Sequence, residues 1–133
     1  MSSFGLILSH DDADHPFITT FPYAKGLQPL YEQIGCDLVE VAARGVIAGI
    51  AVTLLIDEEG LYKRPTYRNR AANDLAASLT GNPAYAHELP LVGHAVLVMD
   101  TGEDWRGFTA QELATVVAAL EHDGHDCIVA KGA

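Results

Sequence analysis

Positive charge is scarce in this chain. Its 133 residues include only eight lysines and arginines against eighteen aspartates and glutamates, and the formal net charge is −10 at pH 7. Such a balance disfavours nonspecific binding to DNA, RNA or anionic membranes, because all three carry negative charge themselves. We therefore expect no direct nucleic-acid partner and no membrane partner.

Cysteines and long apolar runs are scarce as well. Cys36 and Cys127 are far apart and lack the spacing of metal ligands, which favours two reduced thiols. The longest apolar run, residues 46–56, is far shorter than the roughly 20 residues that cross a bilayer. The first residues lack the positive charge and the apolar length of a signal peptide. These absences predict a cytoplasmic protein.

Enzyme motifs are also missing. The sequence has no nucleophile elbow, no P-loop, no glycine-rich dinucleotide fingerprint and no Cys-x-x-Cys pair. His94 lies in an apolar segment, where a core or edge histidine is a simpler interpretation than a catalytic base. Residues 10–15 and 122–126 are rich in histidine and aspartate, but both segments are typical of solvated turns. We therefore predict no catalytic residue, no metal ion and no cofactor, and we favour a non-enzymatic protein.

The composition is that of a folded domain. Apolar residues make up 49% of the chain and charged residues 20%, which excludes intrinsic disorder as a general description. A chain of this length can bury a core without disulfides or metal. We expect one domain that spans residues 1–133.

Apolar and β-branched segments predict a mainly antiparallel sheet of about five strands. The expected strands are residues 4–9, 17–21, 36–43, 45–56 and 91–99, of which the first two should pair. Because residues 45–56 are nearly all apolar, we place them at the sheet centre, buried on both faces. The next four residues, 57–60, predict a tight hairpin with Gly60 at positive φ and a short returning strand from Leu61.

Two to three helices complete an α+β domain. Apolar residues recur at helical spacing over residues 27–34, and Gly35 provides a C-terminal stop. A second helix is expected from the N-cap Asn69 to residues 80–81, and residues 82–90 are expected to form a loop.

The third helix has the strongest local signal. Thr109 and Glu112 have the spacing of a capping box, and Phe108 and Leu113 occupy the two positions of a hydrophobic staple. These four residues predict that the helix begins immediately after Thr109.

Half of the cationic side chains fall within eight residues, at Lys63, Arg64, Arg68 and Arg70. We call residues 63–70 the basic window. Outside it, four cations stand against eighteen carboxylates, or −14. One interpretation is charge neutralisation, in which Lys63 and Arg64 pair with Glu58 and Glu59 across the predicted hairpin.

The other interpretation of the basic window is a binding site for a small anion. Arg68 and Arg70 flank the N-cap Asn69, where helix N–H groups and the helix dipole favour a phosphate or carboxylate. Tyr62 and Tyr67 would add a stacking face for a base. Both interpretations stay open on the sequence alone.

A series of short segments stands in a recognisable order along residues 17–120. It comprises residues 30–35, Val39-Glu40-Val41, residues 56–61, Pro65, Asn69, Ala72 and residues 92–98. In this order and spacing, the chain resembles the DUF3846 family of small proteins of unknown function, which are typical of phages and mobile elements. The resemblance implies a phage or mobile-element accessory protein in the host cytoplasm, and it implies no reaction. The chain departs from the family pattern in a longer segment over residues 69–90.

Together these features predict a non-enzymatic accessory protein that binds a host protein or a small anionic ligand. Two alternatives stay open. One is an acidic inhibitor whose carboxylates mimic a nucleic-acid backbone against a basic host protein, and the other is a small enzyme that acts on a phosphorylated metabolite. Exposed strand edges in so apolar a chain also favour a homodimer.

Overall fold

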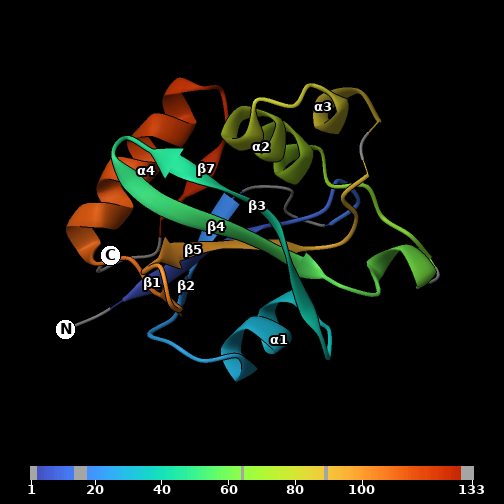
Figure 1. Ribbon diagram of the computed structural model, residues 1–133, viewed down its shortest axis with the longest axis horizontal. Helices are drawn as coiled ribbons and strands as arrows, with labels where there is room; N and C mark the ends of the chain where they lie inside the picture. Colours follow the sequence, from blue (N-terminus) through green and yellow to red (C-terminus); the bar gives the residue numbers. More distant parts are fainter. Residues whose placement is uncertain (1–2, 14–17, 64, 89, 130–133) are drawn as a thin grey trace.

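The computed structural model describes residues 3–13, 18–63, 65–88 and 90–129. Within these ranges the chain forms seven strands and four α-helices, and the strands make one mostly antiparallel sheet (Figure 1). The predicted α+β class is confirmed. The strand number exceeds the predicted five because β6 (Trp105–Arg106) and β7 (Cys127–Ile128) have only two residues each, too few for a periodic pattern.

The longer strands are β1 (Phe4–Leu8), β2 (Ile18–Pro22), β3 (Val39–Ile47), β4 (Ile50–Asp57) and β5 (Ala95–Asp100). Their order in the sheet is β3-β4-β5-β1-β2-β7, and β6 pairs with β5 off this path. The strands pair in antiparallel fashion except for β2 and β7, which run parallel. The predicted pairing of the first two strands is confirmed, although Phe17 lies outside the described residues.

The long apolar segment that we predicted as one central strand contains a turn: residues 50–56 form the buried inner strand β4, as predicted, but residues 45–47 belong to β3. β3 ends at Ile47 and β4 begins at Ile50, and between them Ala48 and Gly49 have φ of 49° and 85°. Two positive φ values suit a tight two-residue hairpin turn. The prediction of a continuous strand was wrong because Ala48, although it has positive φ, is not a residue type that marks a turn in the sequence. β3 is therefore an edge strand, with Val46 64% exposed, and dimerisation through a strand edge stays a prediction.

The acidic segment after β4 does not form the predicted hairpin. Gly60–Tyr62 is a 3₁₀ helix (η1), and the chain passes through two further helices before it returns as β5. Gly60 is not among the described glycines with positive φ. The expected returning strand at Leu61 is therefore also wrong, because a polar turn can end a strand without reversing the chain.

The helices agree more closely with the sequence. α1 (Gln28–Ile34) ends at Gly35 with φ 77°, α2 (Arg70–Thr80) ends at Gly81 with φ 70°, and α4 is Ala110–His122. These three predictions are confirmed. The predicted loop over residues 82–90 is corrected, since it contains the short helix α3 (Ala84–Glu88).

The sheet lies between two layers of helices, with α1 on one side and α2, α3 and α4 on the other (Figure 1). The larger core packs the sheet against α2 and α4, and it includes Leu6, Leu54, Leu97, Leu75, Leu113 and Leu120. The smaller core, on the side of α1, includes Leu30, Ile34, Leu55, Val96 and Val98. No helix in the described part of the chain is long and apolar enough to cross a membrane.

Candidate functional site

Strand register brings several chain segments to one end of the sheet. Leu8, at the end of β1, pairs with Ala95, at the start of β5. The segment before α2 crosses this same end, because Arg68 forms a β-bridge with Val92 and accepts a hydrogen bond from the Asp11 N–H at 2.8 Å. Two neighbouring cavities lie here.

The first cavity, which we call the ring cavity, has a volume of about 240 Å³ and is lined by His10, Tyr67 and His94 among others. The His10 ring is stacked between the other two, with centroid distances of 4.4 Å to Tyr67 and 4.5 Å to His94. The three rings come from the loop after β1, the segment before α2 and the residue that immediately precedes β5. Because stacked rings attract beyond simple burial, this column fastens the three segments together.

The column favours neutral His94. Its Nδ1 accepts a hydrogen bond from the His10 backbone N–H at 3.3 Å. Burial, and after it the neighbouring His10, lowers the pKa of His94 below its usual value. A ring nitrogen that accepts an N–H carries no proton, so the neutral form with hydrogen on Nε2 fits best. The lone pair that a general base would use is therefore already engaged. The Nδ1 of His10 is buried without a hydrogen-bond partner in the described part of the chain.

Two fully buried asparagines, Asn69 and Asn73, hydrogen-bond the backbone segments that meet at this end of the sheet. The Nδ2 of Asn69 donates to the carbonyls of Leu8 and Gly93, both at 2.8 Å, and its Oδ1 accepts the third amide of α2. Asn73 donates to the carbonyls of Asn69 and Leu91 and accepts the Leu91 N–H at 3.1 Å. The sequence predicted the cap at Asn69 but not the buried role of Asn73, because a polar residue inside a helical pattern is expected to face solvent.

An ion pair marks the junction of the cavities. Lys63 pairs with the carboxylate of Asp57, whose side chain is 8% exposed, and it also donates to the Gly35 carbonyl at the end of α1. The hydrogen bond to Asp57 raises the pKa of Lys63 above its usual value. The lysine therefore neutralises Asp57, whereas we had expected Glu58 or Glu59 as its partner.

Of the other residues predicted for the anion site, Tyr67 lines the ring cavity together with Lys63, whereas Tyr62 does not line it. Arg64 lies outside the described residues. Tyr62 is 85% exposed on η1, whereas Tyr67 lies against the His10 ring. One face of Tyr67 is thus covered by a ring of the chain itself, where we had expected a base to stack.

Arg68 and Arg70 do flank the N-cap of α2, and both are exposed. Neither forms an ion pair with any residue that the structure describes. The backbone N–H of Arg70 donates to the carboxylate of Asp11 at 2.8 Å, and the Ala72 N–H donates to Asn69. A carboxylate of the chain already lies where the expected anion would meet the helix. The anion site stays a prediction, with the two guanidinium groups as its donors.

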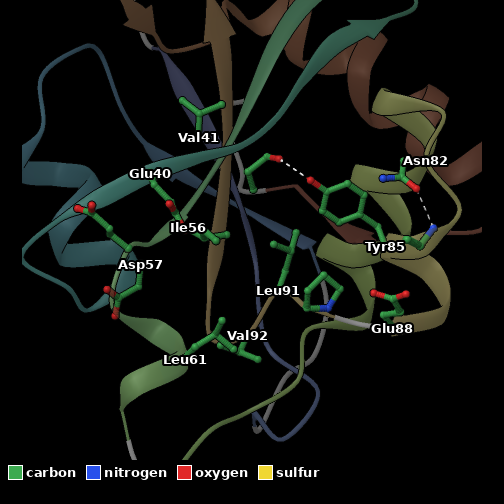
Figure 2. A pocket seen from close by; sticks show the side chains of 14 residues that line it. Glu40, Val41, Ile56, Asp57, Leu61, Asn82, Tyr85, Glu88, Leu91 and Val92 are labelled. Atoms are coloured by element: carbon green, nitrogen blue, oxygen red, sulfur yellow. Dashed lines mark hydrogen bonds between the residues drawn. The ribbon is translucent and has the colours of Figure 1, made fainter.

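The second cavity, which we call the acidic cavity, has a volume of about 400 Å³ and lies where β3 and β4 face α3 (Figure 2). Figure 2 shows Glu40 and Asp57 on one side, Glu88 on the other, and Leu91 between them. Apolar side chains line much of the wall: Val41, Ile56, Leu61, Tyr85, Leu91 and Val92. Sequence reasoning missed this cavity because α3 was predicted as loop.

The carboxylates of the acidic cavity are largely uncompensated. Asp57 has Lys63, but Glu40, Glu58 and Glu88 form no ion pair with the described residues. No lysine or arginine is among the described residues that line this cavity. Because several like charges surround apolar walls of low dielectric, the cavity holds a concentrated negative potential.

Two further sets of candidate groups are the cysteine thiols and the side chains that could bind a metal ion. Burial raises the pKa of Cys127 to about 11 and that of Cys36 above its usual value, so both thiols stay protonated at neutral pH. In the described ranges, no three or more His, Cys, Asp or Glu side chains gather closely enough to hold a metal ion. Asp14 and His15, from the first histidine-rich segment, lie outside those ranges.

No protein-family model matches this chain, and comparisons with curated proteins and with solved structures find no match either. The resemblance to the DUF3846 family therefore stays a prediction that rests on the quoted segments.

Proposed function

We propose that this protein is a non-enzymatic binding protein whose partner is a basic protein. The observation that carries the proposal is the lack of internal compensation for its negative charge. Of the carboxylates in the described residues, only those of Asp57, Asp100 and Glu112 form ion pairs. The others leave a field of one sign at the surface, which accelerates encounter with a positively charged partner.

The states of His94 and of the two cysteine thiols support a binding role. The His94 lone pair is engaged by a backbone N–H, and burial keeps both cysteine thiols protonated. In the setting that the DUF3846 resemblance implies, the partner is a host protein. A surface of this charge also suits an inhibitor that takes the place of nucleic acid on that partner.

A second candidate function is binding of a small anionic ligand beside α2. The observation that favours it is that Arg68 and Arg70, both exposed, form no ion pair with the described carboxylates although the chain is strongly acidic. Guanidinium groups are the preferred donors for phosphate and carboxylate. This candidate needs no basic protein.

Capture on the immobilised protein tests the first proposal. We expect basic proteins to be retained at low salt and released as the salt concentration rises, because exposed charge pairs are screened. An unrelated protein of equal net charge is the control. Equal retention on both columns would contradict the proposal. Competition by duplex DNA identifies a partner whose nucleic-acid surface is the one bound. Thermal stabilisation by phosphate, sulfate or nucleotides tests the second candidate separately.

A further inference from the structure

We infer that the acidic cavity receives a lysine or arginine side chain of a partner protein, an identification of the partner's chemistry that rests on the proposed function. The aliphatic part of that side chain would lie over Ile56, Leu91 and Val92. Its charged end would lie in the negative potential that Glu40, Glu58 and Glu88 create around the cavity. The chemical class is thus a cation with an apolar stem.

The size and walls of the cavity fit such a side chain. Its volume of about 400 Å³ lies within the range of about 300–1,000 Å³ that small-ligand sites occupy. Ile56 and Leu91 are buried at 8% and 6% exposure and form a fixed apolar wall. Val41 and Leu61, at 38% and 59% exposure, bring apolar surface to the cavity. Apolar surface of this kind is covered when a partner docks.

The charge of the cavity selects a long cationic side chain over other ligands. An anion is repelled, because Glu40, Glu58 and Glu88 have no cation beside them in the described structure. A metal ion is disfavoured, because those described carboxylates do not gather into a group of three that could hold one. Lysine and arginine match both features of the site, since their stems cover apolar surface while their heads reach carboxylates at its edge.

The walls are held in place before any partner arrives. The Tyr85 O–H donates to the Ala42 carbonyl at 3.3 Å, which ties α3 to β3, and Figure 2 shows this bond at the cavity wall. The Asn82 side chain accepts the Ala84 N–H at 3.0 Å. Hydrogen bonds from the buried Asn73 hold both backbone groups of Leu91. A preformed site loses less conformational entropy on binding.

The test uses a capped peptide, Ala-Leu-Lys-Leu-Ala, titrated into the isotope-labelled protein and followed by NMR. Two matched peptides carry norleucine or glutamate in place of the lysine. We expect the lysine peptide to shift the amide signals of Glu40, Glu58 and Leu91, and to bind more tightly than either matched peptide. Shifts confined to other parts of the protein, or equal binding of the norleucine peptide, would overturn the inference.

Paired variants separate the cavity from the overall charge. The double variant Glu58→Gln/Glu88→Gln should weaken binding of the lysine peptide by about two- to thirtyfold, because it removes two exposed carboxylates that attract the lysine. The control Glu103→Gln/Glu121→Gln makes the same charge change outside the cavity and should leave affinity within about twofold. All four side chains are exposed, so folding should survive, and melting curves verify it. An equal loss in both variants would assign binding to the general field and defeat the inference.

The same variants distinguish this inference from the proposed function. Suppose that immobilised Glu58→Gln/Glu88→Gln protein captures as much basic protein as the immobilised wild type does. The cavity inference then fails and the proposed function stands. If the lysine peptide binds in the cavity but no basic protein is captured, the proposed function fails and the cavity remains a site for an amphipathic cation.

Discussion

The helices α2 and α4 pack on the same face of the sheet, yet their first turns are held in different ways. At α4 the cap is local: Thr109 Oγ1 accepts the Glu112 N–H at 3.2 Å, and the Glu112 carboxylate accepts the Thr109 N–H at 2.9 Å. At α2 the cap involves distant segments. The Asn69 side chain also donates to the Leu8 carbonyl, and the Asp11 carboxylate accepts a hydrogen bond from the first N–H of the helix. A local cap stabilises one helix, whereas a long-range cap also positions the ring cavity.

The largest effect should follow from Asn69→Ala. This change removes a helix cap together with the amide donors to the buried Leu8 carbonyl and the partly buried Gly93 carbonyl. We expect a loss of about 3–7 kcal/mol in the free energy of unfolding, from about 1 for the cap and about 1–3 for each of the two carbonyls. Urea unfolding measures the loss.

Asn69→Ser is the matched variant, because its hydroxyl oxygen keeps a cap acceptor while the two amide donors are lost. We expect its stability to lie between those of the wild type and Asn69→Ala. A loss for Asn69→Ala no greater than that of a cap alone would show that the long-range bonds contribute nothing.

Thr109→Ala should cost less, about 1 kcal/mol, because only the cap acceptor of α4 is lost. Thr109→Ser should restore most of that stability, since it keeps the hydroxyl. The NMR signals of His10 and His94 should stay unchanged in both variants. Movement of those signals would show that the cap of α4 acts at a distance, which would remove the contrast between the two helices.

This contrast also explains what could be predicted from the sequence. The capping box was predictable because Thr109 and Glu112 are three residues apart, and so was the N-cap role of Asn69. The bond from Asn69 to Leu8 and the bond from Arg70 to Asp11 join residues 61 and 59 positions apart, and no local pattern encodes such a contact. The candidate sites were predicted least well, because both cavities are built from long-range contacts.

The hairpin between β3 and β4 was not predicted from the sequence, for a different reason. Its turn uses Ala48 at φ 49°, a conformation that single-sequence patterns assign to glycine or asparagine. The apolar run of residues 46–56 therefore read as one strand, and its first residues were placed at the centre of the sheet when they lie at the edge. Composition identified the strand-forming residues correctly but not where the chain reverses.

Acid should affect the two helix ends in different pH windows, beginning with His94 beside α2. Burial lowers the pKa of His94 in the folded protein below its usual 6.5, so the unfolded chain binds the proton more readily. Stability should therefore fall as the pH drops below about 6.5, until it reaches the folded pKa. Urea unfolding at pH 7 and pH 5 checks this. His94→Asn, which keeps a hydrogen-bond acceptor, should flatten the decline, and an unchanged slope would contradict the role of His94.

At α4 the corresponding window is lower. Hydrogen bonds from Arg106 lower the pKa of Glu112 below its usual 4.5, with Thr109 as a further donor and burial opposing the shift. The stabilisation from Glu112 should be complete above pH 4.5 and be lost as the pH falls through the folded pKa. We expect Glu112→Gln to show a shallower decline below pH 4.5 and an unchanged slope between pH 5 and 7. Because this side chain is 21% exposed, screening keeps the effect small.

The smallest effect on folding should come from Arg68→Ala/Arg70→Ala. Both side chains are exposed and form no ion pair with described residues, and the Arg70 bond to Asp11 uses the backbone N–H, which alanine retains. Removal of positive charge beside a helix N-terminus is also slightly favourable. We expect the melting temperature to change by no more than about 3 °C, which corresponds to a change of about 0.5 kcal/mol in the free energy of unfolding.

The matched control for that double variant is Arg106→Ala at the other helix. Arg106 donates to both carboxylate oxygens of Glu112 at 3.0 Å, so its loss should lower the melting temperature more than the loss of both window arginines. Any stabilisation of the wild type by phosphate, sulfate or nucleotides should persist in Arg106→Ala and disappear in Arg68→Ala/Arg70→Ala. If the double variant instead melts well below the wild type, Arg68 and Arg70 serve to hold the fold against nearby carboxylates, as Arg106 does, and they are not held available for a ligand.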